Sequence, residues 1–151
     1  MYNLTETEKA YLAGLFDGEG CIGFYEETGK DKHFVMVTIS NTDFRIMKWL
    51  DEHISFGSIN AKHKMPKPNW KQGWTWQIRS REEVQEFLTT IQPYLLIKKE
   101  QAALLLSHLD AEQKTLHHNG RKLSEDIIAN RRDITKRLKL LKMETYTASI
   151  N

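Results

Sequence analysis

Small residues recur at every fourth position of the first helix that the sequence predicts, over residues 6–18. Two of them, Gly14 and Gly18, each cost about 1 kcal/mol relative to alanine inside a helix. Together with Ala10 they form a flat ridge on which a second backbone can approach closely. We therefore expect this ridge to pack against another element. The spacing alone leaves open whether that element is internal or a second copy of the chain.

The start and the buried side of this helix can be predicted as well. Thr5, followed three residues later by Glu8, matches the capping box that begins many helices. Leu12, Leu15 and Phe16 lie on a different side from the small residues, so we expect them to face the core.

Along the rest of the chain, segments in which apolar residues have the spacing of a strand are followed by segments in which they have the spacing of a helix. The expected strands are 21–27, 33–40, 58–64 and 74–80, and the expected helices after the first are 42–54, 81–95, 99–108 and 124–143. Thr42 is the expected cap of the second helix. The fold class is thus α+β, an αββαββα core with an antiparallel β-saddle and C-terminal helices. We expect one domain over residues 1–151, with a core at about 5–108 and a helical part at about 109–151.

The composition indicates in which cellular environment the protein is expected to work. Hydrophobic residues make up 40% of the chain and charged residues 28%, which is typical of a globular protein. Cys21 is the single cysteine, so no intramolecular disulfide can form. Neither a membrane-spanning run nor a signal peptide is evident, so we expect an intracellular protein with no membrane partner.

Basic residues gather in one acid-free stretch, although the net charge is only +2. From residue 60 to residue 81 the chain has no Asp or Glu and carries Lys62, Lys64, Lys67, Lys71, Arg79 and Arg81. Three tryptophans lie among them. Such a stretch predicts a polyanionic partner. Residues 121–143 hold eight basic and three acidic side chains, a pattern that serves either phosphates or an ordinary solvated helix face.

Glu19 follows the predicted ridge and precedes a strand. One carboxylate is a poor magnesium site, because hard divalent cations take several oxygen ligands. If the ridge meets its own copy across a two-fold axis, two Glu19 carboxylates come together at the helix ends. A nucleic acid then adds phosphate oxygens.

The stretch YLAGLFDGEG (11–20) resembles the signature of the LAGLIDADG homing endonucleases. Phe16 replaces Ile of that signature, Gly18 replaces Ala, and Glu19 replaces the final Asp. The segments ISNTD (39–43) and IQPYLLIKKEQA (91–102) also resemble this family, and the resemblance extends over residues 11–106.

The resemblance implies a function and its residues. Members with one copy of the motif act as homodimers, and this chain has one. It implies that Glu19 and the backbone carbonyl of Gly18 bind Mg²⁺, with Mn²⁺ or Ca²⁺ able to substitute in binding. It also implies that Lys98 and Asn41 assist the attacking water. Cleavage of both strands of a near-palindromic site would leave 3′ overhangs. The dimer interface is expected to include Ala10, Ala13, Gly14, Asp17 and Gly18.

Strand alternation predicts which side chains face the DNA. The expected contacts, on the side of the sheet to which Glu19 points, are Gly23, Tyr25, Glu27, Met36, Thr38, Ser40, Asn60, Lys62, Lys64, Thr75, Gln77 and Arg79. A β-ribbon fits the major groove, where each base pair has its own pattern of donors and acceptors.

Two other functions stay open at this point. The chain could be a catalytically silent nucleic-acid binder of the same fold, such as an intron-splicing maturase that binds its own intron RNA, or a transcription regulator. It could also be a structural dimer. Glu19 argues against the first, and the basic stretch argues against the second.

Overall fold

The computed structural model describes residues 3–27, 30–62, 71–115 and 123–147. Its elements, in chain order, are α1 (Glu6–Glu19), β1 (Gly20–Glu26), β2 (His33–Asn41), α2 (Phe44–His53), β3 (Ser58–Ala61), β4 (Trp74–Ile78), α3 (Arg81–Ile91), the short 3₁₀ helix η1 (Gln92–Tyr94), α4 (Lys99–Thr115) and α5 (Glu125–Thr147). The predicted αββαββα order and the C-terminal helices are confirmed.

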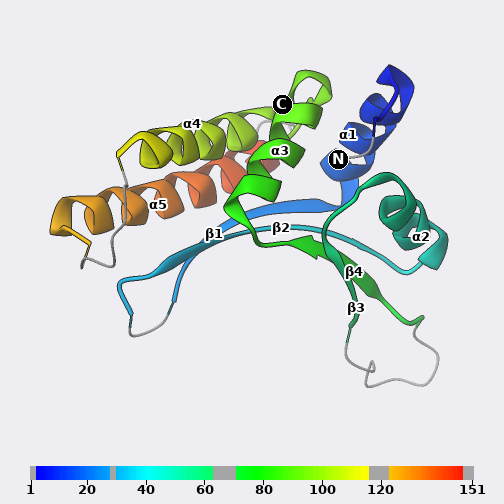
Figure 1. Cartoon of the computed structure of the whole chain (residues 1–151), viewed down its shortest axis with the longest axis horizontal. Helices are drawn as coiled ribbons and strands as arrows, with labels where there is room; N and C mark the ends of the chain where they lie inside the picture. Colours follow the sequence, from blue (N-terminus) through cyan, green and yellow to red (C-terminus); the bar gives the residue numbers. More distant parts are fainter. Residues whose placement is uncertain (1–2, 28–29, 63–70, 116–122, 148–151) are drawn as a thin grey trace.

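The strands form one antiparallel sheet in the order β1-β2-β4-β3. The sheet is curved, and the helices lie on its convex side, so its concave face is open (Figure 1). β1 and β2 form the longer arm of the sheet and continue beyond the ends of β3 and β4. None of the helices in the described ranges is long and apolar enough to cross a membrane.

Alternating side chains of the strands fill the space between sheet and helices. Val35, Val37 and Ile39 of β2 are buried, and Met36 and Thr38 between them are only partly buried. Burying every second apolar side chain removes one face of each strand from water and fixes the register. The predicted inward and outward faces of β1, β2 and β4 are therefore confirmed.

The beginning of α2 differs from the prediction. Asp43, not Thr42, is the N-cap, and its side chain accepts a hydrogen bond from the Arg45 N–H. The Asn41 side chain accepts a hydrogen bond from the Asp43 N–H at 2.8 Å. This bond shapes a turn, so the helix begins later in the chain than predicted. Phe44, the first residue of α2, is 48% exposed and contacts the ring of Trp74 edge to face.

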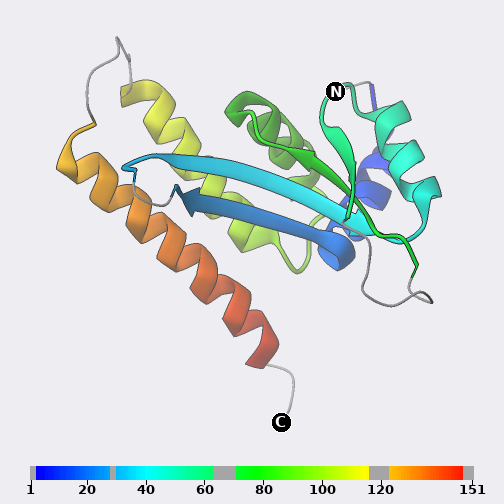
Figure 2. The same cartoon turned by 90° about the horizontal axis from the view of Figure 1, so that it is seen from below.

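The C-terminal helices are longer than predicted and complete the core. α5 runs beside the edge strand β1 (Figure 2). Thr135 donates a hydrogen bond to the carbonyl oxygen of Phe24 at 3.3 Å, and Ile134 and Leu138 join the main core cluster. An exposed strand edge invites pairing with other chains, so α5 protects this edge.

A buried ion-pair cluster holds α3, α4 and α5 together. The Glu112 carboxylate accepts from Arg131 Nε at 2.5 Å and also pairs with Arg81. The side chains of Glu112 and Arg131 are both 7% exposed. Burial raises the pKa of Glu112, but hydrogen bonds from Arg131 and Arg81 outweigh it and hold the pKa below its ordinary value.

This cluster yields a stability prediction. Glu112→Leu should lower the free energy of unfolding by about 3–5 kcal/mol, because it leaves the Arg131 guanidinium buried without its carboxylate. The double variant Glu112→Leu/Arg131→Leu should lose much less, since no deeply buried charge is left unpaired and the Arg81 side chain, which is 34% exposed, can be hydrated. Urea unfolding of both variants measures the difference. Equal losses would show that the pairing itself contributes nothing.

Candidate active site and nucleic-acid interface

The small-residue ridge of α1 lies on the surface of the subunit. Ala10, Gly14 and Gly18 are exposed. A Cβ atom added to Gly14 or Gly18 would meet no atom within 4 Å in the described part of the chain. Among the described residues the two glycines therefore serve no internal packing, which contradicts the alternative of an internal partner from these residues. Ala13, expected in the same surface, is fully buried in the subunit core, so that part of the interface prediction is also wrong.

The opposite side of α1 anchors it. Leu12 and Phe16 are fully buried, and Leu15 packs against the core from its edge, as predicted. The last glycine of the motif, Gly20, passes so close to Phe16 that a Cβ atom there would lie 2.2 Å from the ring. A glycine at this position lets β1 leave directly from the end of the helix.

Glu19 is the last residue of α1 and is exposed. Because β1 begins at the next residue, the carboxylate lies at the start of the long arm of the sheet. Within the described ranges, no group of three His, Cys, Asp or Glu side chains could hold a metal ion. One subunit thus offers Glu19 and the Gly18 carbonyl, which fit a divalent cation when a second copy and phosphate oxygens supply the other ligands.

Asp17, which is expected in the dimer interface, makes two hydrogen bonds within the subunit. Its two carboxylate oxygens accept hydrogen bonds from the backbone N–H groups of Leu96 and Lys98, at 2.8 and 2.9 Å. These bonds fasten the segment before α4 to the end of α1. Asp17 therefore positions Lys98, a link between residues 81 positions apart that local sequence patterns do not reveal.

The Lys98 ammonium group lies at the end of α1, and its action near an attacking water stays a prediction. This group donates a hydrogen bond to the carbonyl oxygen of Asp17, two residues before Glu19. Burial lowers the pKa of Lys98 below its usual range, and the negative charge of Asp17 opposes that shift.

A second lysine, Lys142 of α5, reaches the same region. Its Nζ atom lies 3.6 Å from the thiol sulfur of Cys21, two residues after Glu19. Two ammonium groups thus contact residues two positions before and two positions after Glu19. The sequence signal was the excess of basic residues over 121–143, but helical periodicity could not single out Lys142.

Asn41 is the last residue of β2. Its side-chain oxygen accepts a hydrogen bond from the Asp43 N–H, so it shapes the turn that leads into α2. Its action on an attacking water stays a prediction.

The open face of the sheet carries polar side chains in rows. Ser40, Thr75 and Asn60 are register partners across β2, β4 and β3, and the Ser40 and Thr75 hydroxyls lie 2.9 Å apart. The next row holds Thr38 and Gln77 together with Ser58, which the sequence prediction omitted. These side chains are at least partly exposed. Their hydroxyl and amide groups can donate and accept hydrogen bonds at base edges.

Other predicted DNA contacts have mixed outcomes. Lys62 and Arg79 are exposed, whereas Lys64 lies outside the described residues. Gly23 faces the predicted side but is buried, because the Tyr25 ring occupies the space next to it, so its predicted direct contact is wrong. Glu27 pairs with Lys30 at 2.5 Å.

Arg81, part of the basic stretch, pairs with the buried Glu112 on the helical side and so is not placed to meet DNA.

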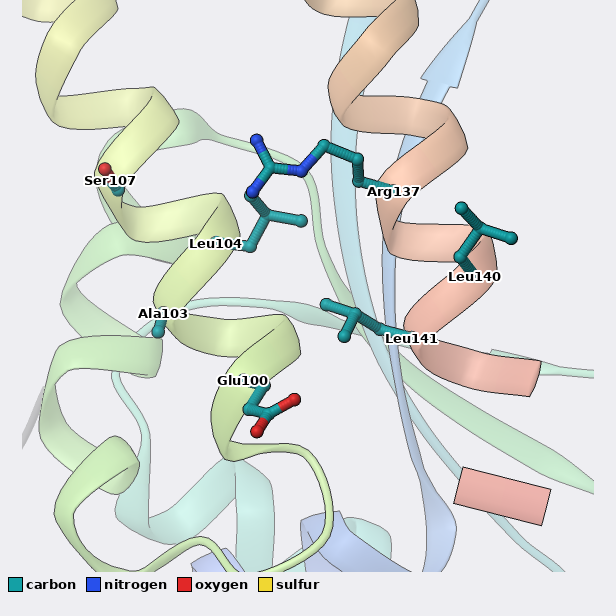
Figure 3. A pocket seen from close by; sticks show the side chains of 7 residues that line it. All are labelled: Glu100, Ala103, Leu104, Ser107, Arg137, Leu140 and Leu141. Carbon is teal, nitrogen blue, oxygen red and sulfur yellow. The ribbon is translucent and has the colours of Figure 1, made fainter. Parts of the chain in front are cut away.

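A separate groove lies between α4 and α5 (Figure 3). Its volume is about 530 Å³, and it is lined by Glu100, Ala103, Leu104, Ser107, Arg137, Leu140 and Leu141. The groove is on the helical side of the molecule, away from the open sheet face, and is not part of the candidate site.

Comparisons with known proteins agree with this architecture. Residues 6–92 match the family model described as a LAGLIDADG-like domain. No curated protein sequence matches the chain.

Solved structures of homing endonucleases share the fold. I-CvuI in complex with the I-CreI target is 22% identical with a TM-score of 0.57, and the match covers 89% of this chain and 96% of that chain. I-TnaI is 18% identical with a TM-score of 0.64, covering 96% and 99% of the two chains. I-AabMI bound to uncleaved DNA is 18% identical with a TM-score of 0.66, covering 90% of this chain and 48% of that chain.

The matched segment spans more than half of the chain and contains the ridge, Glu19 and all four strands. The chain belongs to the family of LAGLIDADG-like domains and has the fold of the homing endonucleases.

Proposed function

We propose that this protein is a magnesium-dependent endonuclease that cleaves double-stranded DNA as a homodimer. The observation that carries the proposal is the exposed ridge of α1, which ends at an exposed carboxylate where the open polar face of the sheet begins. One surface can thus serve dimer formation and metal binding, and the adjoining surface can bind DNA.

The loss of helix stability that the ridge glycines cause is the argument for a dimer. Gly14 and Gly18 weaken α1, and nothing in the described subunit uses the space they leave. A second α1 packed across a two-fold axis uses it, because two helices can then approach at backbone distance. The same packing places the two Glu19 residues near the axis.

A divalent cation bound by Glu19 and the Gly18 carbonyl would lower the pKa of a bound water and stabilise the leaving oxygen. Mg²⁺ is the expected metal. The I-CvuI structures were determined with Mg and with Ca, which supports divalent metals as a test condition here.

The protein's own groups act around that centre. Lys98, held by Asp17, provides positive charge where negative charge develops on the phosphate. Lys142, which reaches Cys21 two residues after Glu19, can contact a backbone phosphate. Asn41 is the candidate for orienting the attacking water.

DNA would lie along the concave face of the sheet. The polar rows centred on Thr75 and Gln77 present donors and acceptors to the major groove. A two-fold symmetric protein requires a near-palindromic target. Cleavage that leaves 3′ overhangs follows from the family resemblance.

Loss of the proposed metal ligand Glu19 should slow DNA cleavage but leave DNA binding nearly unchanged. A target is first selected from a randomised duplex library by binding to the wild-type protein. Glu19→Gln should retain the dissociation constant within severalfold but lower the rate of magnesium-dependent cleavage by about 100-fold or more, the typical cost of removing a charge-stabilising group.

Glu52→Gln is the matched control, because it neutralises an exposed carboxylate of α2 on the helical side of the sheet and should leave the cleavage rate unchanged. Cleavage by neither the wild type nor the variants, with binding by all, would contradict the enzyme and favour the silent binder. Full cleavage by Glu19→Gln would exclude Glu19 as the metal ligand.

The ridge makes a prediction for assembly. Gly14→Leu should convert the dimer to a monomer in sedimentation experiments, because a leucine side chain keeps the two helices apart. Its circular dichroism should show an intact fold, since a Cβ at Gly14 meets no neighbour and leucine favours the helix by about 0.8 kcal/mol. Ser107→Leu, at an exposed position of α4, should remain a dimer. A dimeric Gly14→Leu protein would contradict assembly through the ridge.

Asp17 should affect activity through Lys98. Asp17→Ala removes two charge-assisted hydrogen bonds, so it should lower the free energy of unfolding by about 1–3 kcal/mol. It should also lower the cleavage rate about tenfold or more.

Ser80→Ala, which removes the cap of α3 on the helical side, is the comparison for Asp17→Ala. It should lower stability without slowing cleavage of the bound target. If both variants slow cleavage equally, the effect comes from stability and not from the position of Lys98.

A further inference from the structure

The open face of the sheet changes character along the β1-β2 arm. Beyond the polar rows, three apolar side chains, Tyr25, Phe34 and Met36, project on the open side. We name these three residues the apolar patch. It lies where β1 and β2 continue past the ends of β3 and β4 (Figure 1).

Register and ring contacts make the patch continuous. Tyr25 is the register partner of Phe34, and their ring centroids lie 5.4 Å apart at an interplanar angle of 35°. Met36 is the partner of Gly23, whose missing side chain leaves room for the Tyr25 ring. Phe34, the second residue of β2, is 40% exposed, although phenylalanine is among the side chains most often fully buried.

The helices do not cover this patch. α5 contacts β1 from the helical side and the edge, where Arg132 pairs with Glu26 and Thr135 bonds to the Phe24 carbonyl. Glu26 and Phe24 alternate with Tyr25, so the patch points the opposite way. The open side belongs to the same surface as the polar rows and is therefore continuous with the proposed DNA-binding face.

Apolar side chains limit what this part of the face can recognise. Phe34 and Met36 cannot donate hydrogen bonds to a base. A polar base edge that packs against them gives up its hydrogen bonds to water and gains none from the protein, which costs binding free energy. Tyr25 is directed back toward Cys21, where burial and the neighbouring thiol raise the pKa of its phenol. The apolar group that the major groove does present is the C5-methyl of thymine.

We propose that the apolar patch recognises thymine methyl groups in the outer part of each half-site. This inference rests on the proposed DNA-binding function. Tyr25 lies six residues beyond Glu19, which is about 20 Å along an extended strand and about six base pairs along the duplex. Thymine is thus selected far from the scissile phosphates, and hydrogen-bonding residues select the inner bases.

Nucleotide analogues test the methyl group directly with wild-type protein. Selection from a randomised library should return thymine at one or more outer positions of both half-sites. Replacing such a thymine by deoxyuridine keeps every hydrogen-bonding group and removes the methyl. The affinity should fall about fourfold per half-site, the effect of one buried methyl group. At the same position cytosine should bind more weakly than 5-methylcytosine.

Variants assign the effect to the patch. In Phe34→Ala or Met36→Ala, the affinity for the thymine and deoxyuridine duplexes should become equal at the affected position. Gln77→Ala, in a polar row, should keep the fourfold difference there and lose discrimination at an inner position. Thermal unfolding confirms that each variant is folded.

Three outcomes would overturn the inference: no thymine preference at outer positions, equal affinity of the wild type for thymine and deoxyuridine, or an unchanged difference in both patch variants. Failure of the wild type to bind any duplex would instead overturn the proposed function itself.

Discussion

The contact between Gly20 and the Phe16 ring decides where the chemistry of this protein can lie. Phe16 is fixed in the core, and the glycine allows β1 to pass directly over it. Helix α1 therefore ends at the start of the sheet, and Glu19 lies at their junction. With Leu12 and Phe16 turned inward, Gly14 and Gly18 must face outward. A larger residue at position 20 would move the strand, and the metal ligand would no longer adjoin the DNA-binding face.

Patterns local in sequence predicted most of the fold. Strand alternation placed Val35 and Val37 inside, because each second side chain of a half-buried strand must leave water. The start of α2 was predicted too early, because Asn41 and Asp43 both favour turn and cap positions. The structure shows that Asn41 accepts from the Asp43 N–H in the turn and that Asp43 caps the helix. The extent of α5 depends on its contacts with β1, which lie more than a hundred residues earlier.

The site residues within the single motif could be predicted from the sequence. Those that come together from distant segments could be predicted less well. Helical periodicity predicted the ridge and placed Glu19 at its end, and the structure shows that the ridge is exposed. Asp17 was assigned to the interface, since nothing local shows that its oxygens reach Lys98. Arg81 looked like part of a basic surface, but a carboxylate 31 residues away neutralises it. Lys142 reaches Cys21 from a helix that the motif does not include.

The most direct measurement of the shared-site mechanism is a crystal structure of the wild-type protein bound to its selected duplex in the presence of Ca²⁺. The account predicts two subunits per duplex with their α1 ridges in contact and each bound cation near Glu19, between the two helix ends and the DNA phosphates. Cations held by one subunit alone, or subunits that meet through another surface, would contradict it.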